Sequence, residues 1–291
     1  MGNGPEEYTG ISNVIFDEKN EEVFVNAANS PRILVYSLAG VYKRALTLPD
    51  NIRNRTIYYF DDETLLVYDV TGLRADEYKE DPYLFVSKRD GGIVSTLDFR
   101  LPSRYATMTA PLYSITGEIR QPPIMFAIPN NIHFGEDFVI ADLSSDTIYR
   151  LNVKNKKLVP LLVRKPSVHE SSQFKTMLAS MFTTDKFMFL WKVALDIDAA
   201  LDNRDVFTRL MCEIETGMTY NVRFINDDCP FEEWTSYTEN LNIGKNMTAV
   251  LIDVVMIKDA LEEGKLKGDL ERLTPSLGEE DNPIVMILKF K

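Results

Sequence analysis

The residues best suited to binding a metal ion are aspartates in one short acidic stretch. Asp196, Asp198, Asp202 and Asp205 lie in the segment DIDAALDNRD at residues 196–205. Calcium prefers several carboxylate oxygens from one loop, which makes Asp196, Asp198 and Asp202 candidate calcium ligands. The stretch lacks the glycine and the final glutamate of an EF-hand, and acidic runs are usually exposed. A solvated hairpin tip is therefore the alternative, and we expect no other cofactor.

Histidine and cysteine offer little for catalysis. The two histidines, His133 and His169, are too few for a three-histidine zinc site within one chain. A Cys–His pair is formally possible with Cys212 or Cys229, but neither cysteine has a recognisable nucleophile context. We expect no catalytic residue. Buried free thiols are our interpretation of the cysteines, and a disulfide between them stays open.

Two tryptophans and three cationic or imidazole side chains are the candidate ligand-binding residues. Rigid aromatic rings and fork-shaped guanidinium groups favour contact with a ligand or a partner. The set consists of Arg164, His169, Trp191, Arg223 and Trp234. The alternative for each of them is packing within or between β-sheets.

The glycines of GNGPEEY at residues 2–8 could suggest a loop that binds phosphate. Neither the lysine of such a loop nor a following helix is present. We interpret the segment as a linker with Tyr8 packed between sheets.

Strand patterns recur in sets of four along the chain and must position any site. Runs such as EVFVNAA and RILVYSL are rich in strand-forming residues and are separated by turn residues. The pattern predicts an all-β fold, a β-propeller, in a single domain over residues 1–291. The blades are expected at approximately 9–50, 51–103, 104–166, 167–229 and 230–291.

The third and fifth sets carry the least regular patterns. We expect the first strand of the third set within PIMFAI at residues 123–128. In the fifth set, residues 255–273 have near-helical apolar spacing, which predicts an inserted helix. Residues 283–291 then read as a closing strand.

Composition excludes several functional classes. The chain has 32 Lys and Arg residues against 44 Asp and Glu residues, which gives a net charge of −12. Such a charge repels the phosphate backbone, so we expect no nucleic-acid partner. No apolar stretch reaches the length of a transmembrane helix, and the N-terminus lacks a secretory signal pattern.

Three segments carry a resemblance to a known family. They are GNGPEEY at residues 2–8, SSDTIYRL at 144–151, and ALEEGKLKGDLERL with the following strand at 260–291. Together they resemble the bacterial six-bladed β-propeller proteins that are similar to NHL-repeat propellers. The NHL-like signature spans Asp142 to Ile148, and in the first set Asn26 takes the aspartate position. We interpret Asp142 and Asn26 as residues that cap turns.

The resemblance implies six blades, whereas about five sets are found in this chain. Family members are often lipoproteins of unknown function that begin with a signal and a further blade. The resemblance therefore implies a location in the periplasm or cell envelope. We expect a non-enzymatic binding or scaffold propeller whose ligand is a peptide, a glycan or a partner protein. The alternative is an enzyme similar to calcium-dependent lactonase or hydrolase propellers, and a structural role within a larger envelope assembly is a third possibility.

Overall fold

The computed structural model describes most of the chain in separate stretches. The described residues are 4, 6–28, 30–49, 52, 55–69, 81–101, 107–109, 112–113, 119–120, 124–126, 132–134, 137–170, 175–195, 207–225, 228, 241–244, 246–278 and 280–290. The chain forms two compact units, and each is described by itself. Unit 1 comprises residues 1–128, 142–146 and 151–158, and unit 2 comprises residues 129–141, 147–150 and 159–291.

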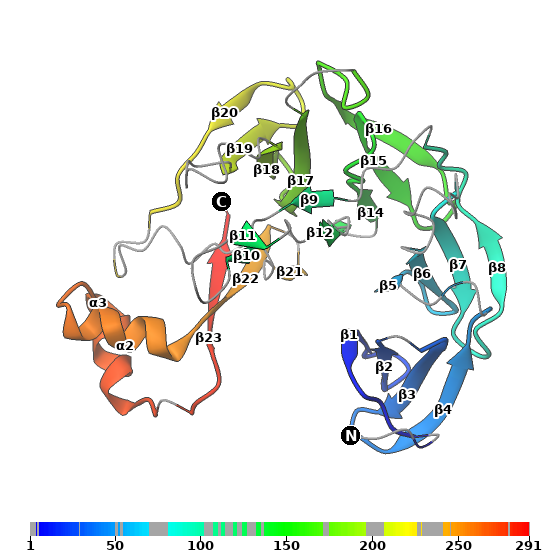
Figure 1. The fold of residues 1–291 in the computed structure, drawn as a ribbon, viewed down its shortest axis with the longest axis horizontal. Coiled ribbons are helices and arrows are strands. Elements are labelled where there is room, and N and C mark those ends of the chain that lie inside the picture. The colour runs from blue at the N-terminus through cyan, green and yellow to red at the C-terminus, as the bar shows by residue number, and fades with distance from the viewer. Residues whose placement is uncertain are drawn as a thin grey trace. The chain divides into compact units, whose positions relative to one another are not determined.

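Unit 1 begins with two four-stranded antiparallel sheets whose strands follow chain order (Figure 1). The first sheet contains β1 (Ile11–Asp17), β2 (Glu22–Ala27), β3 (Arg32–Ser37) and β4 (Tyr42–Thr47). The second contains β5 (Arg55–Tyr59), β6 (Thr64–Asp69), β7 (Tyr83–Ser87) and β8 (Ile93–Thr96). These two sheets match the first two predicted sets, because runs of strand-forming residues and short polar turns specify a meander locally.

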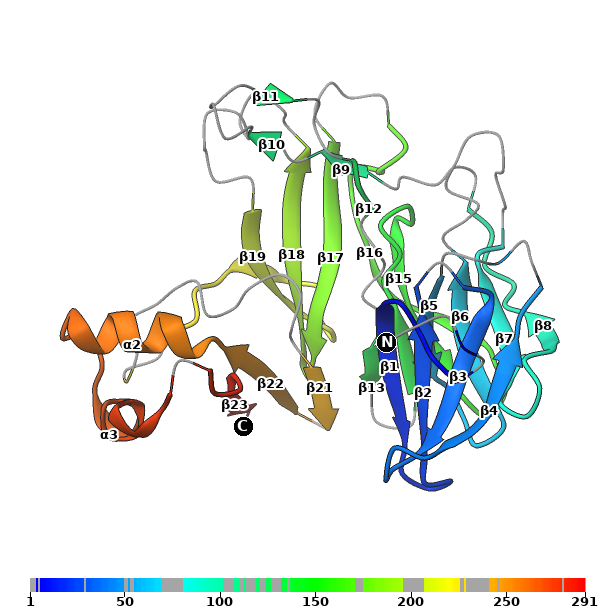
Figure 2. The same cartoon turned by 60° about the horizontal axis from the view of Figure 1, so that its bottom comes forward.

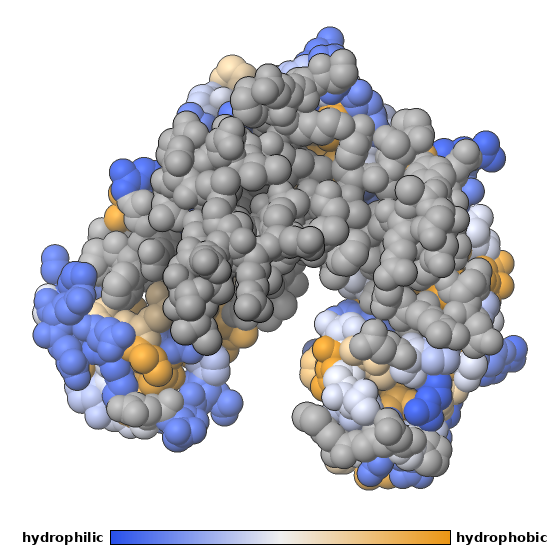
Figure 3. All heavy atoms as spheres, viewed as in Figure 1, coloured by the Kyte–Doolittle hydropathy of each residue, from blue (hydrophilic) through white to orange (hydrophobic). Residues whose placement is uncertain are grey.

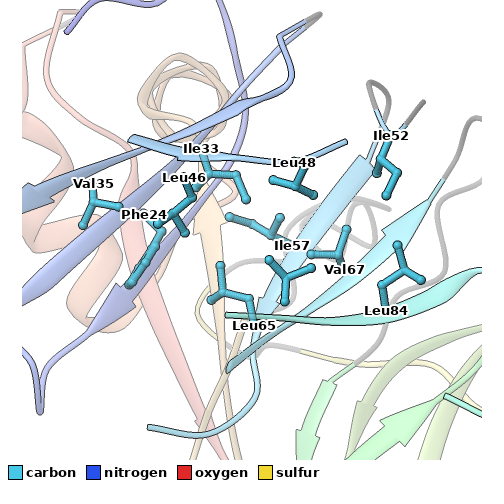
Figure 4. Packing of buried hydrophobic residues seen from close by; sticks show 11 residues of the cluster. Phe24, Ile33, Val35, Leu46, Leu48, Ile52, Ile57, Leu65, Val67 and Leu84 are labelled. Atoms are coloured by element: carbon cyan, nitrogen blue, oxygen red, sulfur yellow. The ribbon is translucent and has the colours of Figure 1, made fainter. Parts of the chain in front are cut away.

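An apolar core fills the space between these two sheets. Phe24, Ile33 and Leu46 from the first sheet face Ile57 and Leu65 from the second, and all five are fully buried (Figure 4). Burial of apolar surface is the main force that holds such sheets together, at about 25 cal/mol per Å². The core therefore fixes where the turns at the ends of the sheets lie.

A polar contact also joins the first two sheets. The side chain of Asn13 on β1 donates a hydrogen bond to the carbonyl of Ile57 at 2.7 Å and accepts one from the Ile57 amide at 3.3 Å. Asn26 donates to the same Asn13 oxygen at 2.9 Å. Asn26 thus supports a contact between sheets, which differs from the predicted capping of its own turn.

The third four-stranded sheet contains β13 (Ile132–Phe134), β14 (Asp137–Ile140), β15 (Thr147–Asn152) and β16 (Leu158–Val163). The prediction of its first strand was wrong, because β12 (Ile124–Phe126) pairs with β9 (Thr107–Thr109) in a separate sheet. A further short pair joins β10 (Leu112–Tyr113) to β11 (Ile119–Arg120). The turn-capping prediction for Asp142 is confirmed, since its carboxylate accepts a hydrogen bond from the Ser144 amide at 2.8 Å.

Unit 2 contains the fourth four-stranded sheet and a three-stranded one. The fourth sheet contains β17 (Lys175–Thr183), β18 (Phe187–Leu195), β19 (Phe207–Glu213) and β20 (Thr219–Asn221). Figure 2 shows β17 and β18 side by side as long strands. The last sheet contains β21 (Leu241–Gly244), β22 (Met247–Ile252) and β23 (Ile284–Lys289). Successive four-stranded meanders are the blades of an all-β, propeller-like fold.

The predicted helix of residues 255–273 is two helices. Helix α2 (Val254–Glu262) is capped at its N-terminus by Asp253, whose side chain accepts a hydrogen bond from the Val255 amide. Gly264 then takes a left-handed φ of 66°, which ends the first helix, and α3 (Gly268–Leu273) continues into the short 3₁₀ helix η2 (Thr274–Ser276). Within the described residues, no helix combines the length and apolar character that crossing a membrane requires.

Candidate functional site

A shallow pocket of unit 1 lies where β1 turns into β2. It has a volume of about 540 Å³ and is lined by Phe16, Asp17, Glu18, Lys19 and Tyr59. The first four residues end β1 and begin its turn, whereas Tyr59 ends β5 in the neighbouring sheet. We call this set of five residues the hairpin pocket. Its walls come from two sheets whose spacing is fixed by their shared apolar core.

Asp17, one of the five residues of the hairpin pocket, takes part in a buried ion pair. Lys88, in the turn between β7 and β8, places its ammonium 2.7 Å from the Asp17 carboxylate, and the two side chains are 5% and 0% exposed. The amide and side chain of Asn20 donate further hydrogen bonds to Asp17 at 3.1 and 2.8 Å. Burial raises the pKa of Asp17, but hydrogen bonds from Lys88 and Asn20 outweigh burial and leave the pKa below its usual value.

Arginine and aromatic contacts hold Lys88 in place. The Arg44 guanidinium bonds both oxygens of Glu22, at 2.5 and 2.8 Å, and also donates to the Lys88 carbonyl at 2.8 Å. The hydrogen bond from Arg44 is the main cause that lowers the pKa of Glu22. The Lys88 ammonium lies 3.8 Å from the centre of the Tyr59 ring, a distance typical of a cation–π contact. Lys88 is therefore fixed from several sides.

The rim of the hairpin pocket joins the two sheets through exposed charges. Lys19 forms an ion pair with Asp62, and the Tyr59 hydroxyl donates a hydrogen bond to the other Asp62 oxygen at 3.1 Å. The hydrogen bond from Lys19 lowers the pKa of Asp62, and the one to Asp62 raises the pKa of Lys19. Burial, the hydrogen bond to Asp62 and nearby carboxylates raise the pKa of Tyr59 to about 12.

The hairpin pocket is better suited to binding a ligand than to transferring protons. Phe16 is 65% exposed beside these fixed charges, so its ring is available to a ligand. Asp17 stays charged and Tyr59 stays protonated at neutral pH, because their pKa values are shifted away from 7. An aromatic surface next to oriented polar groups is typical of a binding site.

Sequence reasoning did not identify this pocket. Residues 17–20 read as a polar turn, and the Asp17–Lys88 pair joins positions 71 residues apart. No local spacing indicates such a pair. The one usable signal was the position of an aromatic residue, Phe16, directly before the polar turn Asp17–Asn20.

Two of the predicted ligand-binding residues lie in the segment after β16. The Arg164 side chain donates a hydrogen bond to the Pro166 carbonyl at 3.0 Å, and the His169 amide donates to the Ser167 hydroxyl at 3.0 Å. Both residues are half-buried. Their proximity in this segment follows from sequence, and their role as ligand contacts stays a prediction.

The remaining predicted residues differ in their surroundings. Trp191 lies within β18, is 6% exposed, and stacks with the guanidinium of Arg209 on β19 at 4.8 Å from the ring centre. Arg223 is exposed just after β20. Trp234 and the candidate calcium ligands Asp196, Asp198 and Asp202 lie outside the described residues.

The calcium hypothesis stays a prediction for the same reason. Over the part of the chain that the structure describes, no group of three or more metal-ligating side chains comes together. Cys212 is a buried free thiol in β19, as predicted, whereas Cys229 falls in an undescribed stretch.

Sequence and structure comparisons place this geometry in context. A family model described as a domain of unknown function (DUF4934) matches residues 1–289. No curated protein matches the sequence. A crystal structure from Bacteroides fragilis NCTC 9343, provisionally described as an exported protein, is similar with a TM-score of 0.61 and 14% identity, over 100% of this chain and 80% of that chain.

Two more distant structures were also found. Virginiamycin B lyase from Staphylococcus aureus has a TM-score of 0.40 and 11% identity, over 81% of this chain and 75% of that chain. A member of the DUF4221 family from Bacteroides vulgatus has a TM-score of 0.31 and 9% identity, over 99% of this chain and 95% of that chain. Such low TM-scores establish neither a shared fold nor a shared activity.

Proposed function

The chain belongs to the DUF4934 domain family, and we propose that it acts as a non-enzymatic binding or scaffold propeller of the bacterial cell envelope. We infer the six-bladed, NHL-like type for the complete fold, from the resemblance of its sequence motifs. The ligand classes that suit the proposal are peptides, glycans and partner proteins. The hairpin pocket is the surface on which we place ligand contact.

The observation that carries the proposal is the exposed Phe16 ring beside a set of locked charges. Asp17 is held by Lys88 and Asn20, so its carboxylate is not available to accept a substrate proton. An exposed aromatic ring next to polar groups of fixed orientation supplies contact area with little loss of conformational entropy on binding. These properties favour recognition over chemistry at this pocket.

The envelope location rests on two supports. The sequence motifs resemble a family that is often exported, and the Bacteroides fragilis structure with the same overall fold is provisionally described as an exported protein. Fractionation of source cells tests this part of the proposal. Recovery of the native protein in the periplasmic or membrane fraction would support it, and recovery only in the cytoplasmic fraction would contradict it.

A binding experiment tests the role of the hairpin pocket. Panels of peptides and of oligosaccharides would be screened by thermal shift, and each hit measured by calorimetry with wild-type protein and with the Phe16→Ser variant. Loss of one exposed aromatic contact should weaken binding by about tenfold, equivalent to about 1.4 kcal/mol. Because Phe16 is largely exposed, the change should leave the fold intact.

A matched control separates the pocket from general surface hydrophobicity. Ile225 of unit 2 is 83% exposed, so Ile225→Ser removes a comparable exposed apolar side chain elsewhere. We expect unchanged affinity for this variant. Equal affinities of wild type and Phe16→Ser would refute the pocket assignment, and chemical conversion of any bound ligand by the wild-type protein would refute the non-enzymatic proposal.

A further inference from the structure

The hairpin pocket places an exposed carboxylate beside an exposed aromatic ring. Phe16, Glu18 and Lys19 are its exposed members, and Lys19 forms an ion pair with Asp62. Glu18 therefore supplies an exposed carboxylate in the same pocket as the Phe16 ring. On the face of the molecule in view, Figure 3 shows apolar and hydrophilic residues side by side over β1–β4. An aromatic ring beside a carboxylate is suited to a cationic ligand.

The two turns that meet at the hairpin pocket carry an excess of negative charge. They are residues 17–21 and 61–63, and the Asn20 side chain joins them by a hydrogen bond to the Asp62 carbonyl at 3.4 Å. Their only cation is Lys19, whereas their carboxylates are those of Asp17, Glu18, Glu21, Asp61, Asp62 and Glu63. The turns therefore surround an exposed aromatic ring with acidic side chains.

Cations from the neighbouring strands reduce this excess but do not remove it. Lys88 supplies one buried ammonium, which is paired with Asp17. Glu22 is paired with both Lys43 and Arg44, and this group carries one further positive charge. With the lysine of the first turn, three positive charges thus oppose the six carboxylates of the two turns. The pocket region is acidic overall and attracts positively charged groups.

The carboxylates of these turns act on a residue that lines the pocket. Burial raises the pKa of Tyr59 to about 12, and the hydrogen bond to Asp62 and the charges of Asp17 and Asp61 act in the same direction. The negative charge of the turns therefore reaches the pocket wall. The same Coulombic effect that disfavours an anionic phenolate at this wall favours a cation.

The chain itself shows how a cation is held in this part of the fold. The Lys88 ammonium lies 2.7 Å from the Asp17 carboxylate and 3.8 Å from the centre of the Tyr59 ring. Phe16 and Glu18 flank the buried Asp17 in the sequence, and both are exposed because side chains alternate along a strand. They offer at the surface the two kinds of group that bind Lys88 in the interior.

We propose that the hairpin pocket binds the cationic side chain of an arginine or lysine residue from a partner polypeptide. This inference rests on the proposed function, because it names the ligand of the same pocket. The face of the Phe16 ring contacts the cation, and the Glu18 carboxylate accepts hydrogen bonds from it. A neutral glycan would make no use of the acidic turns, so a basic polypeptide is the better match.

Titration of the full chain with short capped peptides tests the inference. The probes are acetyl-GGRGG-amide and acetyl-GGKGG-amide, and the amide chemical shifts of residues 16–20 and 59–63 report their binding. A third peptide carries citrulline in place of arginine, which keeps the shape of the side chain and removes its charge. We expect the citrulline peptide to bind about threefold or more weakly than the arginine peptide, because it lacks both the cation–π contact and the ion pair.

Three variants separate the ring, the carboxylate and the overall charge. Phe16→Leu keeps an apolar side chain but removes the ring face, and it should weaken arginine binding about two- to fivefold with little effect on the citrulline peptide. Glu18→Gln should weaken arginine binding about two- to fivefold. Glu215→Gln removes an equal charge from an exposed turn of unit 2 and should leave the affinity unchanged. All three side chains are exposed, so the variants should fold.

Several results would overturn the inference. They are equal affinity for the arginine and citrulline peptides, no shift changes in the pocket with either basic peptide, and equal weakening by Glu18→Gln and Glu215→Gln. Binding of a neutral oligosaccharide that is lost in Phe16→Ser would also overturn it, while leaving the proposed function intact. The proposed function fails separately, if no ligand of any class depends on Phe16 for its affinity.

Discussion

Replacement of Gly91 by alanine tests how closely the second sheet of unit 1 approaches the first. Gly91 lies in the turn between β7 and β8 with a φ of 84°, a left-handed conformation that side chains disfavour. A Cβ atom there would lie 2.8 Å from the amide nitrogen and 2.9 Å from the carbonyl oxygen of Thr47. Thr47 ends β4 in the neighbouring sheet, and its backbone cannot rotate away as a flexible side chain can.

Gly40 provides a matched control for the conformational part of the cost. It lies in the corresponding turn between β3 and β4 with a φ of 79°, and a Cβ atom there would meet nothing within 4 Å. We expect Gly40→Ala to lower the free energy of unfolding by about 1–2 kcal/mol, the cost of a left-handed alanine. Gly91→Ala adds the cost of overpacking, about 1–3 kcal/mol, for a total of about 2–5 kcal/mol.

Urea unfolding followed by far-ultraviolet circular dichroism measures the difference. The two tryptophans occupy positions 191 and 234, beyond unit 1, so their fluorescence would not report on these turns. The dependence of unfolding free energy on urea should be the same in both variants if only stability has changed. If Gly91→Ala unfolds at the same urea concentration as Gly40→Ala, the turn does not press against β4 and our interpretation of the interface is wrong.

Three further outcomes are expected. Asp17→Asn should lower the unfolding free energy by about 3–5 kcal/mol because it leaves the Lys88 ammonium buried without its partner, and a double-mutant cycle with Lys88→Met should show positive coupling. Because the pKa of Asp17 is lower in the folded state than in the unfolded state, its stabilisation is present above about pH 4 and is lost as the pH falls through the folded pKa. The free energy of unfolding of Asp17→Asn should therefore fall less steeply with decreasing pH than that of the wild-type protein. Phe290→Ala should destabilise unit 2 by about 2–3 kcal/mol in thermal unfolding, because the ring packs 4.9 and 5.4 Å from the ring centres of Phe182 and Phe189.

Local sequence patterns predicted those parts of the fold that local forces determine. The strands of the first, second and fourth sheets follow from runs of strand-forming residues and from turns such as Asp90-Gly91-Gly92. The first strand of the third sheet was misplaced because Ile124–Phe126 has a strand pattern but pairs with β9. Periodicity indicates that a segment is a strand without indicating which strand it pairs with.

The helical segment near the C-terminus also shows that a periodic pattern does not determine where an element ends. Apolar spacing over residues 255–273 is close to helical, yet the left-handed Gly264 divides the segment into α2 and α3. A glycine such as Gly264 destabilises a helix interior by about 1 kcal/mol. A cost of this size does not by itself show whether the helix continues through the glycine or ends there. The break lets both helices pack against one apolar cluster, to which α2 contributes Ile257 and Ala260 and α3 contributes Leu270.

The hairpin pocket was missed because it depends on contacts between residues far apart in the sequence, whereas the turn capping by Asp142 was predicted because it is a local contact. Capping by Asp142 concerns a hydrogen bond to Ser144, two residues away, which spacing can predict. The ion pair of Asp17 and Lys88 depends on the packing of two sheets, which a single sequence does not reveal. The same difficulty applies to Trp191, whose contact with Arg209 follows from the register of β18 and β19.

The polar turns, more than the repeated strands, give this chain its individual chemistry. The apolar cores between sheets use interchangeable residues such as leucine, isoleucine and valine, and they would serve any propeller-like fold. The turns use specific pairs instead. Lys88 binds Asp17 between the first two sheets, whereas in unit 2 the Asp185 amide and carboxylate bond the side chain of Asn246 between the last two. Of these two turn contacts, only the Asp17–Lys88 pair adjoins the exposed ring of Phe16, so the two turns differ in what they offer a ligand. We therefore expect the turn residues to determine ligand selectivity.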